Sequence, residues 1–448
     1  MRELAWIVGI IILAAAGWSA PARGQAEAYV EVRKGETYRI PIAIEDFTWD
    51  ALDPVVFAGR ARAEEVLAND LVYTDAFVVV RDAPESHFSP SLLLDVQGNP
   101  VDRAFQARIR GEVGRRRSGL ILRGTLLDEG TGKKIFERSY ELGWDSERLE
   151  ADRWGIHQFA DAVTFYLTGT RGCAATRIAF VRAEGESRDL YLVDWDGFSV
   201  ERATHLNTTL LSPFWHPSGR WLAFTSYHEG LPRIFSLDLE RGGLEVLADG
   251  DTPAAPAFSR DGKYVAYSTT RDGNAEIYVA RSDGSRPRRL TVSPAIDTAP
   301  SWSPSGRRLV FTSDRWGSPQ LYVVHADGGN LQQLTFAGSW NDSPDWSPSG
   351  DRIVHACMID GSFELALIHA DGSGWRRLTV GGRCENPRWA PDGRHVIFAR
   401  SKAGRRDLWI LDVDSGSLQR LTRLNGQSYN PAWSYAAKER LCPPNPGG

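Results

Sequence analysis

The C-terminal part of the chain repeats one short cassette six times: a proline, any residue, then an aromatic residue. The cassettes are Pro213-Phe-Trp215, Pro256-Ala-Phe258, Pro300-Ser-Trp302, Pro344-Asp-Trp346, Pro387-Arg-Trp389 and Pro431-Ala-Trp433. Their aromatic residues, called the anchors below, follow one another at intervals of 43 or 44 residues. A constant period of this length, with four short apolar runs in each unit, is typical of a β-propeller. Function is therefore expected on the loops of a ring.

Each repeat predicts four strands joined by tight turns. After the anchor Trp302, strands are expected at 308–313, 320–324 and 332–335, with glycines in the turns between them. The strands are rich in β-branched and aromatic residues, and glycine supplies the positive φ that such turns need. The proline of each cassette is expected near the first residue of the innermost strand, where no ladder hydrogen bond is lost. The anchors are expected to pack between neighbouring blades.

The two ends of the repeat array predict how the ring closes. The first strands, 177–181, 189–193 and 200–204, have no cassette before them, and Trp433 has no strands after it. Residues 429–434 should therefore supply the inner strand of blade one, which removes the sheet edges that an open array would expose. The sequence thus predicts an all-β six-bladed β-propeller over residues 171–442, closed by its C-terminal strand, with a tail at 443–448.

Two further parts are predicted before the propeller. Residues 1–26 have the pattern of an export signal, with Arg2, an apolar run and then small residues; a retained membrane anchor is the alternative. Residues 27–170 predict a small α/β domain. Its expected elements are strands at 39–47 and 76–80, a helix at 55–71, a hairpin at 120–142 and a helix at 150–167.

Composition and motifs give no sign of catalysis. A net charge of -5 and a pI near 6.0 argue against nucleic-acid binding, which favours a basic face. The nine histidines are scattered over different phases of the repeat. We expect no catalytic residue, no cofactor and no metal ion. A propeller-channel enzyme or small-ligand-binding protein is the alternative, for which only Asp342 and Glu385 lie at one channel level on adjacent blades.

Several ordered segments resemble the TolB family of Tol-Pal envelope systems. Besides the repeat they are Val30-Glu-Val-Arg33, Ile40-Pro-Ile-Ala-Ile-Glu-Asp-Phe47, His157 with Asp161, Leu167-Thr-Gly169, Thr176-Arg-Ile-Ala-Phe180 and Asp194-Trp-Asp-Gly197. The resemblance implies a non-enzymatic, monomeric adaptor of the periplasm that associates peripherally with the envelope and supports outer-membrane integrity and cell division. It implies a Pal-like lipoprotein at the propeller mouth, and a TolA-like inner-membrane protein at the segment Val30, Glu31, Val32 and Arg33. A surface protein without Tol partners is a further alternative.

One departure from the family concerns the propeller mouth. Family members commonly carry Asn-Thr-Glu-Pro before the anchor, where this chain has Asp297-Thr-Ala-Pro300. The threonine is kept and the carboxylate is lost, so a changed partner is expected.

Chain direction predicts which loops share a face. The loops that enter the inner strands should lie on the same face as the turns between second and third strands. The expected partner-binding residues are Asp297, Thr298, Asp342, Glu385 and Tyr429 at the channel mouth, and His228, Arg271, Arg315 and Trp316 on the rim. Their chemistry differs between blades, as a specific protein site requires, whereas ordinary solvated loops are the alternative.

The four cysteines predict two disulfides if the chain is exported. Cys357 ends a second strand and Cys384 lies in the loop entering the next blade, so a bridge is expected on one face. Cys173 precedes the first blade and Cys442 follows the last anchor, so their bridge would latch the ring closure. Free thiols are the alternative for both pairs.

Overall fold

The computed structural model describes residues 39–49, 53–81, 95, 97, 105–117, 119–142, 144–145, 150–151, 153–185 and 187–435. All of these residues belong to one compact unit, Arg39–Gly448. The predicted export signal, the segment 30–33, Cys442 and the tail 443–448 lie outside the described residues. In the part that is described, no helix combines the length and the apolar character needed to cross a bilayer.

The N-terminal part is built on a mixed β-sheet. Its strands are β1 (Ile40–Ile44), β2 (Thr48–Trp49), β3 (Phe77–Arg81), β4 (Ala107–Arg116), β5 (Gly119–Asp128) and β6 (Lys134–Leu142), and a separate pair consists of β7 (Trp144–Asp145) and β8 (Glu150–Ala151). The order in the sheet is β3-β1-β4-β5-β6, with β2 also paired to β4. β1 runs parallel to β3 and β4, whereas β4, β5 and β6 form an antiparallel meander. The predicted hairpin is confirmed, but β4 was not predicted, because its arginines and glycines obscure the alternation of a strand.

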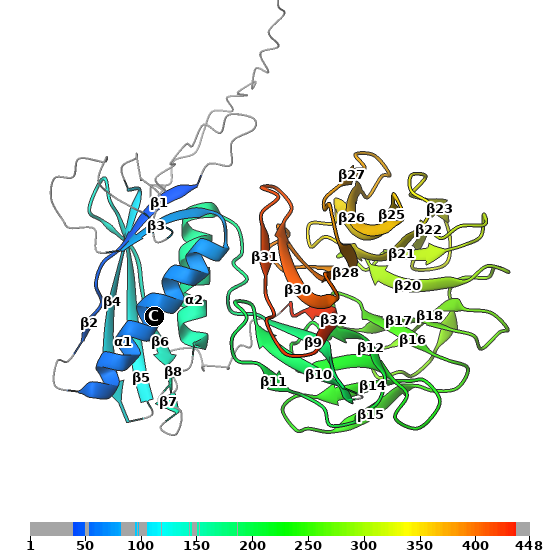
Figure 1. The fold of residues 1–448 in the computed structure, drawn as a ribbon, viewed down its shortest axis with the longest axis horizontal. Coiled ribbons are helices and arrows are strands. Elements are labelled where there is room, and N and C mark those ends of the chain that lie inside the picture. The colour runs from blue at the N-terminus through cyan, green and yellow to red at the C-terminus, as the bar shows by residue number, and fades with distance from the viewer. Residues whose placement is uncertain are drawn as a thin grey trace, which may run out of the picture. The chain divides into compact units, whose positions relative to one another are not determined.

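Two helices, α1 (Pro54–Tyr73) and α2 (Trp154–Thr168), contact this sheet and each other (Figure 1). Asp53 caps α1 by accepting a hydrogen bond from the Val55 N–H at 2.9 Å, and Pro54 stands in the first turn, where no backbone donor is needed. In the middle of β5, a Cβ added to Gly124 would lie 2.5 Å from the ring of Phe159. This glycine therefore sets how closely α2 approaches the sheet.

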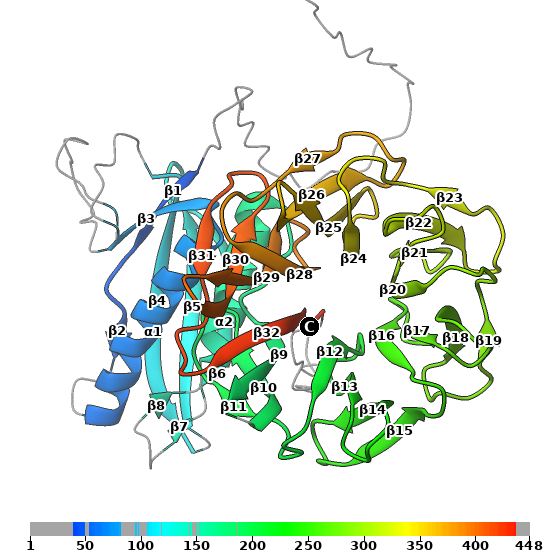
Figure 2. The same ribbon diagram turned by 45° about the vertical axis from the view of Figure 1, so that its right-hand side comes forward.

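The remaining strands form six four-stranded antiparallel sheets, the blades, around a ring (Figure 2). From the innermost strand outward, blade one contains β32 (Gln427–Trp433), β9 (Arg177–Glu184), β10 (Ser187–Asp194) and β11 (Glu201–Arg202), blade two β12 (Leu210–Trp215), β13 (Trp221–Ser226), β14 (Arg233–Asp238) and β15 (Leu244–Ala248), and blade three β16 (Ala254–Phe258), β17 (Tyr264–Thr269), β18 (Glu276–Arg281) and β19 (Arg288–Arg289). Blade four contains β20 (Asp297–Trp302), β21 (Arg308–Ser313), β22 (Gln320–His325) and β23 (Gln332–Gln333), blade five β24 (Asn341–Trp346), β25 (Arg352–Ile359), β26 (Ser362–His369) and β27 (Arg376–Arg377), and blade six β28 (Arg383–Trp389), β29 (His395–Lys402), β30 (Arg405–Asp412) and β31 (Leu418–Arg420).

The ring closes as predicted, because the last strand completes the first blade. β32 pairs antiparallel with β9, with Gln427 opposite Ala183 and Trp433 opposite Ile178. The N–H of Ser434 donates to the carbonyl of Arg177 at 2.9 Å, which continues the pairing beyond the strand. The six-bladed propeller and its closure by the C-terminal strand are confirmed.

The cassette prolines do not lie where we expected. Pro300 is the fourth residue of β20, and the register between β20 and β21 shifts between Thr298 and Ser301. Equivalent bulges occur in all six inner strands, each with a non-glycine residue of positive φ directly before the proline: Ser212, Ala255, Ala299, Ser343, Asn386 and Asn430. The bulge displaces the backbone from the ladder, so the proline removes no hydrogen bond although it stands in mid-strand.

The anchors link neighbouring blades, as predicted. Trp215 of blade two donates its indole N–H to Ala432 O of blade one at 3.0 Å. Trp302 and Trp389 donate in the same way to the inner strands of the blades before them. Three of the six anchors therefore join neighbouring blades by a hydrogen bond as well as by packing.

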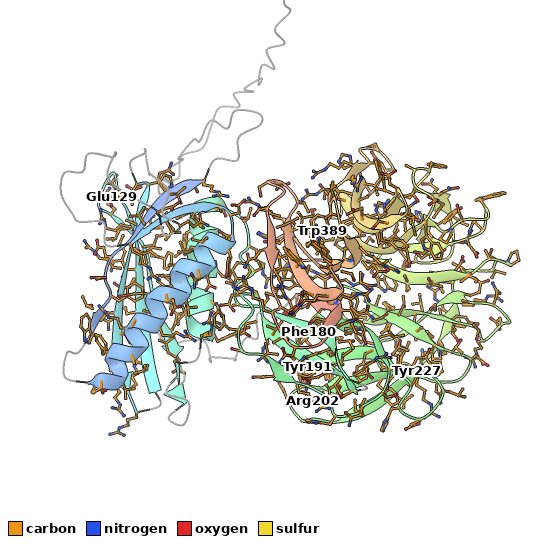
Figure 3. All side chains as sticks on the ribbon, in the orientation of Figure 1. Glu129, Phe180, Tyr191, Arg202, Tyr227 and Trp389 are labelled. Carbon is orange, nitrogen blue, oxygen red and sulfur yellow. The ribbon has the colours of Figure 1, made fainter. Side chains whose placement is uncertain are left out.

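One layer of side chains recurs across the blades and is broken once. Aromatic residues of the second and third strands face each other in five blades: Phe180 and Tyr191, Phe224 and Phe235, Tyr267 and Tyr278, Phe311 and Tyr322, Phe398 and Trp409. Figure 3 shows Phe180, Tyr191 and Arg202 in succession across blade one. In blade five the pair is His355 and Ala366. His355 is fully buried, neither ring nitrogen has a hydrogen-bond partner among the described residues, and burial lowers its pKa to about 3.

Candidate functional site

One face of the propeller gathers the residues that the sequence singled out. We call it the loop face: it comprises the loops entering the inner strands and the turns joining second and third strands. Because strands alternate in direction within each blade, both sets of loops lie at the same end of the ring. Asp297, Thr298, Asp342, Glu385 and Tyr429 all lie at the starts of inner strands on this face.

Asp297 and Arg315 form a buried ion pair within blade four. The Nη2 atom of Arg315 lies 3.1 and 3.0 Å from the two carboxylate oxygens of Asp297, whose side chain is inaccessible to solvent. The Nε–H of Arg315 donates to Ser313 Oγ at 2.9 Å, and its guanidinium lies over the ring of Tyr322. These groups hold the turn that carries Trp316, so the pair shapes the loop face instead of standing free on it.

The other two carboxylates at the mouth also have partners within the chain. Asp342 accepts hydrogen bonds from Thr312 Oγ1 at 3.0 Å and from the N–H of Ser343 at 2.6 Å, and burial raises its pKa. Glu385 is bound by Arg383 at 2.8 Å and by Arg406 at 2.6 Å. Both acids are half-buried, so a partner would meet them as oriented groups within a network.

Tyr429 and Thr298 are half-buried at the channel mouth, and the guanidinium of Arg406 lies 5.9 Å from the Tyr429 ring centroid. The rim residues His228, Arg271 and Trp316 are exposed, Trp316 by 80%. The structure thus places all nine predicted residues on one face. Asp297, Arg315, Asp342 and Glu385 have partners within the chain, whereas His228, Arg271 and Trp316 are exposed.

Apart from the aromatic residues that it named, the sequence interpretation missed the apolar residues of this face. Val292, Phe336 and Val380 are 80%, 80% and 72% exposed and occupy one equivalent position in three consecutive blades. Each follows the threonine that ends the outer part of its blade. Further exposed large apolar residues on the same loops are Tyr227, Leu231, Ile296 and Trp340. The 44-residue spacing of the three threonine-following residues was a signal that could have revealed them.

The channel below the mouth holds a buried carboxylate that accepts hydrogen bonds from two neighbouring blades. It is lined by the middle residues of the cassettes, including Ser301, Asp345 and Arg388. Asp345 accepts from Ser301 Oγ at 3.2 Å and from the N–H of Trp389 at 2.8 Å, and burial raises its pKa. Tyr435 enters the same channel, with the guanidinium of Arg260 4.0 Å from its ring centroid.

A buried polar cluster joins the helices to blade one. His157 Nδ1 lies 2.7 Å from Asp70 Oδ2, and Trp195 donates its indole N–H to Asp70 Oδ1 at 2.9 Å. Arg153 forms an ion pair with Asp196 beside them. Burial by itself lowers the pKa of His157, and the carboxylates of Asp70, Asp196 and Asp194 outweigh burial and raise it to about 9.

Asp161, one helical turn after His157, holds the linker into the propeller. Its carboxylate accepts the N–H groups of Ala174 at 2.7 Å and Ala175 at 3.0 Å. A Cβ on Gly172 would lie 2.2 Å from its Oδ1, so only glycine admits this approach. Both residues of the His157/Asp161 motif therefore have structural roles in this chain: His157 contacts α1, and Asp161 binds the linker.

The predicted bridge between Cys357 and Cys384 is wrong. Both are buried free thiols in the structure, as is Cys173. Cys357 lies on β25, with Asn341 and Glu364 as its cross-strand neighbours, whereas Cys384 starts the next blade and donates to Gly382 O at 3.7 Å. The two thiols face different neighbours although they lie near the same face. The pairing of Cys173 with Cys442 concerns a residue outside the described ones.

Comparisons with known proteins agree with this architecture. A family model described as the TolB beta propeller domain matches residues 165–437. The Tol-Pal system protein TolB of Bordetella avium is 34% identical over 291 residues, which cover 62% of this chain and 60% of the relative. That of Desulfosudis oleivorans is 30% identical over 272 residues, 59% of this chain and 60% of the relative. The chain thus spans about 60% of the length of the curated relatives it matches. The crystal structure of TolB from Acinetobacter baumannii aligns with a TM-score of 0.75 at 26% identity, covering 89% of this chain and 97% of that one.

Proposed function

Because the chain belongs to the TolB β-propeller family, we propose that it is a non-enzymatic adaptor of a periplasmic Tol-Pal envelope system. Its propeller binds a Pal-like lipoprotein through the loop face, and its N-terminal segment 30–33 binds a TolA-like inner-membrane protein. The relatives named above are themselves Tol-Pal system proteins, which supports this assignment. In this role the protein supports outer-membrane integrity and constriction at cell division.

One observation carries the proposal: large apolar side chains are exposed together on the loop face. Trp316, Phe336 and Val292 are each 80% exposed on neighbouring loops of blades three and four. A contiguous exposed apolar patch rimmed by polar groups marks an interaction site, and aromatic residues dominate the energy of protein interfaces. The partner is therefore expected to cover blades three to five more closely than the rest of the ring.

The paired acids at the channel mouth, Asp342 and Glu385, would orient the bound lipoprotein on the loop face. Asp342 and Glu385 are held by Thr312 and by two arginines, so their negative charge is fixed in place before a partner arrives. Charged groups of this kind set association rate and specificity more than affinity. We expect basic or amide groups on the facing surface of the lipoprotein.

A binding measurement with matched variants tests the proposal. Trp316→Ala combined with Phe336→Ala should weaken binding of the purified Pal-like lipoprotein at least tenfold, because truncating central interface aromatics costs about 2 kcal/mol or more. The control is Leu244→Ala combined with Val246→Ala, which removes exposed apolar groups from the outer strand of blade two. Equal affinity for wild type and the first double variant would contradict binding at the loop face.

The charge contribution is tested separately. Asp342→Ala with Glu385→Ala should reduce capture of the lipoprotein and slow association while changing the melting temperature little. Unchanged capture would move the polar part of the interface elsewhere. Deleting residues 27–38 should abolish capture of a TolA-like protein and leave binding of the lipoprotein intact. Retained capture would contradict the role given to 30–33.

A further inference from the structure

Three side chains with metal-binding chemistry meet at the end of the linker. Cys173 lies between α2 and β9, whereas Asp392 lies in the turn between β28 and β29 of blade six and His395 is the first residue of β29. The thiol of Cys173 is 3.3 Å from Asp392 Oδ2, and His395 Nδ1 is 2.5 Å from the same oxygen. One ligand atom from each residue lies within 4.8 Å of the others. Cys173 and His395 are buried, and Asp392 is nearly so.

Neighbouring groups orient these side chains as outer partners orient metal ligands. Asp392 Oδ1 accepts the N–H groups of Arg394 at 2.8 Å and His395 at 3.0 Å, which leaves Oδ2 facing the thiol and the imidazole. Hydrogen bonds that orient a ligating carboxylate in this way are common at metal sites.

We propose that Cys173, Asp392 and His395 bind one Zn²⁺ ion, which fastens the linker to blade six. Thiolate, imidazole and carboxylate are the ligands that Zn²⁺ prefers, and three protein ligands leave its fourth tetrahedral position to water. On binding, the thiol of Cys173 loses its proton to solvent, and the sulfur then bonds to the metal. The ion would hold the end of the linker, Cys173, against a turn more than 200 residues away in sequence.

In a second cluster of the described residues, fixed side chains already bind the carboxylates. Asp70, His157 and Asp196 also converge within 4.8 Å. There, however, the guanidinium of Arg153 pairs with Asp196, and the indole N–H of Trp195 occupies Asp70. A fixed cation and a fixed donor already meet the carboxylates of that cluster. At Cys173, by contrast, Asp392 Oδ2 contacts the thiol and the imidazole of the other two candidate ligands.

Metal titration of the full mature chain, purified with reduced thiols, tests the proposal. Co²⁺ should bind with one equivalent and produce a thiolate-to-cobalt charge-transfer band, which Zn²⁺ then displaces. Cys173→Ser should remove the band and weaken Zn²⁺ binding about 100-fold or more, and His395→Gln should weaken it similarly. The matched control, Cys357→Ser, alters another buried thiol and should keep both band and affinity.

Absence of a charge-transfer band in wild type, or Zn²⁺ binding that Cys173→Ser leaves unchanged, would overturn the site. Peptide mapping that finds Cys173 bridged to Cys442 in protein taken from the periplasm would also overturn it.

Discussion

Trp195 of blade one donates its indole N–H to Asp70 of helix α1 across 125 residues of sequence. Both side chains are buried, and the ring of Tyr73 packs edge-on against Trp195. The carboxylate of Asp70 also faces His157 of α2, so one acid connects both helices to the first blade.

Trp195→Phe should destabilise the protein, because the buried carboxylate of Asp70 loses a donor. An unmet hydrogen bond to a buried acceptor costs about 1–3 kcal/mol, and we expect the free energy of unfolding in urea to fall by about that amount. Trp375→Phe, which alters a partly exposed indole on blade five, should change it little. Equal effects of the two changes would show that the bond to Asp70 adds nothing.

Protonated His157 should make the fold sensitive to alkaline pH. Its folded pKa of about 9 exceeds its ordinary value of 6.5, so its contribution is complete below pH 6.5 and is lost as pH rises through 9. Between these limits, the unfolding free energy of wild type should fall more steeply than that of His157→Gln, as urea unfolding at several pH values would show. Parallel curves would contradict a protonated His157 at neutral pH.

His355 should have the opposite pH dependence. Its folded pKa of about 3 lies below 6.5, so the unfolded chain binds more protons and stability falls as pH drops below 6.5. His355→Phe restores the aromatic residue of the other blades and should stabilise the protein by about 1–2 kcal/mol near neutral pH, because it removes unsatisfied buried nitrogens. Its advantage should grow at pH 5. His369→Phe, at an exposed position of the same blade, is the control, and an equal gain there would refute the argument.

Ala299→Gly should be tolerated although it lies in a β-strand. Ala299 has a φ of 51°, and relief of a left-handed L-residue offers about 1 kcal/mol, which offsets the entropy that glycine loses on folding. We expect a change within about 1 kcal/mol of wild type by thermal unfolding, of either sign. The same substitution at Ala266, buried in the centre of β17, should cost clearly more, because it removes apolar packing without relieving strain. A larger loss at Ala299 than at Ala266 would contradict a strained bulge.

The blades could be predicted from sequence because their signal is periodic. Six anchors at nearly constant spacing define the ring, and the unpaired ends of the array define its closure. The bulges escaped prediction because Ala299 and its equivalents are not glycines, so nothing in the sequence marks their positive φ. The proline of each cassette accompanies the bulge, but the bulge itself becomes apparent only from the strand register.

The position of the candidate site could be predicted from the sequence, but the side-chain contacts of its residues could not. Strand direction places Asp342, Glu385 and Trp316 on one face, which follows from topology alone. That Arg406 holds Glu385 depends on residues 21 apart, and that Asp70 meets Trp195 depends on domains with unrelated patterns. Such pairings carry no period, so sequence spacing could not reveal them.

The pairing of β32 with β9 also sets the order in which the molecule can become a folded object. Blade one holds its inner strand only when residues 427–433 are present, more than 240 residues after β9. Until then β9 has an unpaired edge and the ring is not closed. A chain that crosses a membrane with its N-terminus first would deliver this strand last. The closed ring could therefore form only after residues 427–433 had crossed, because its closing contact joins strands far apart in sequence.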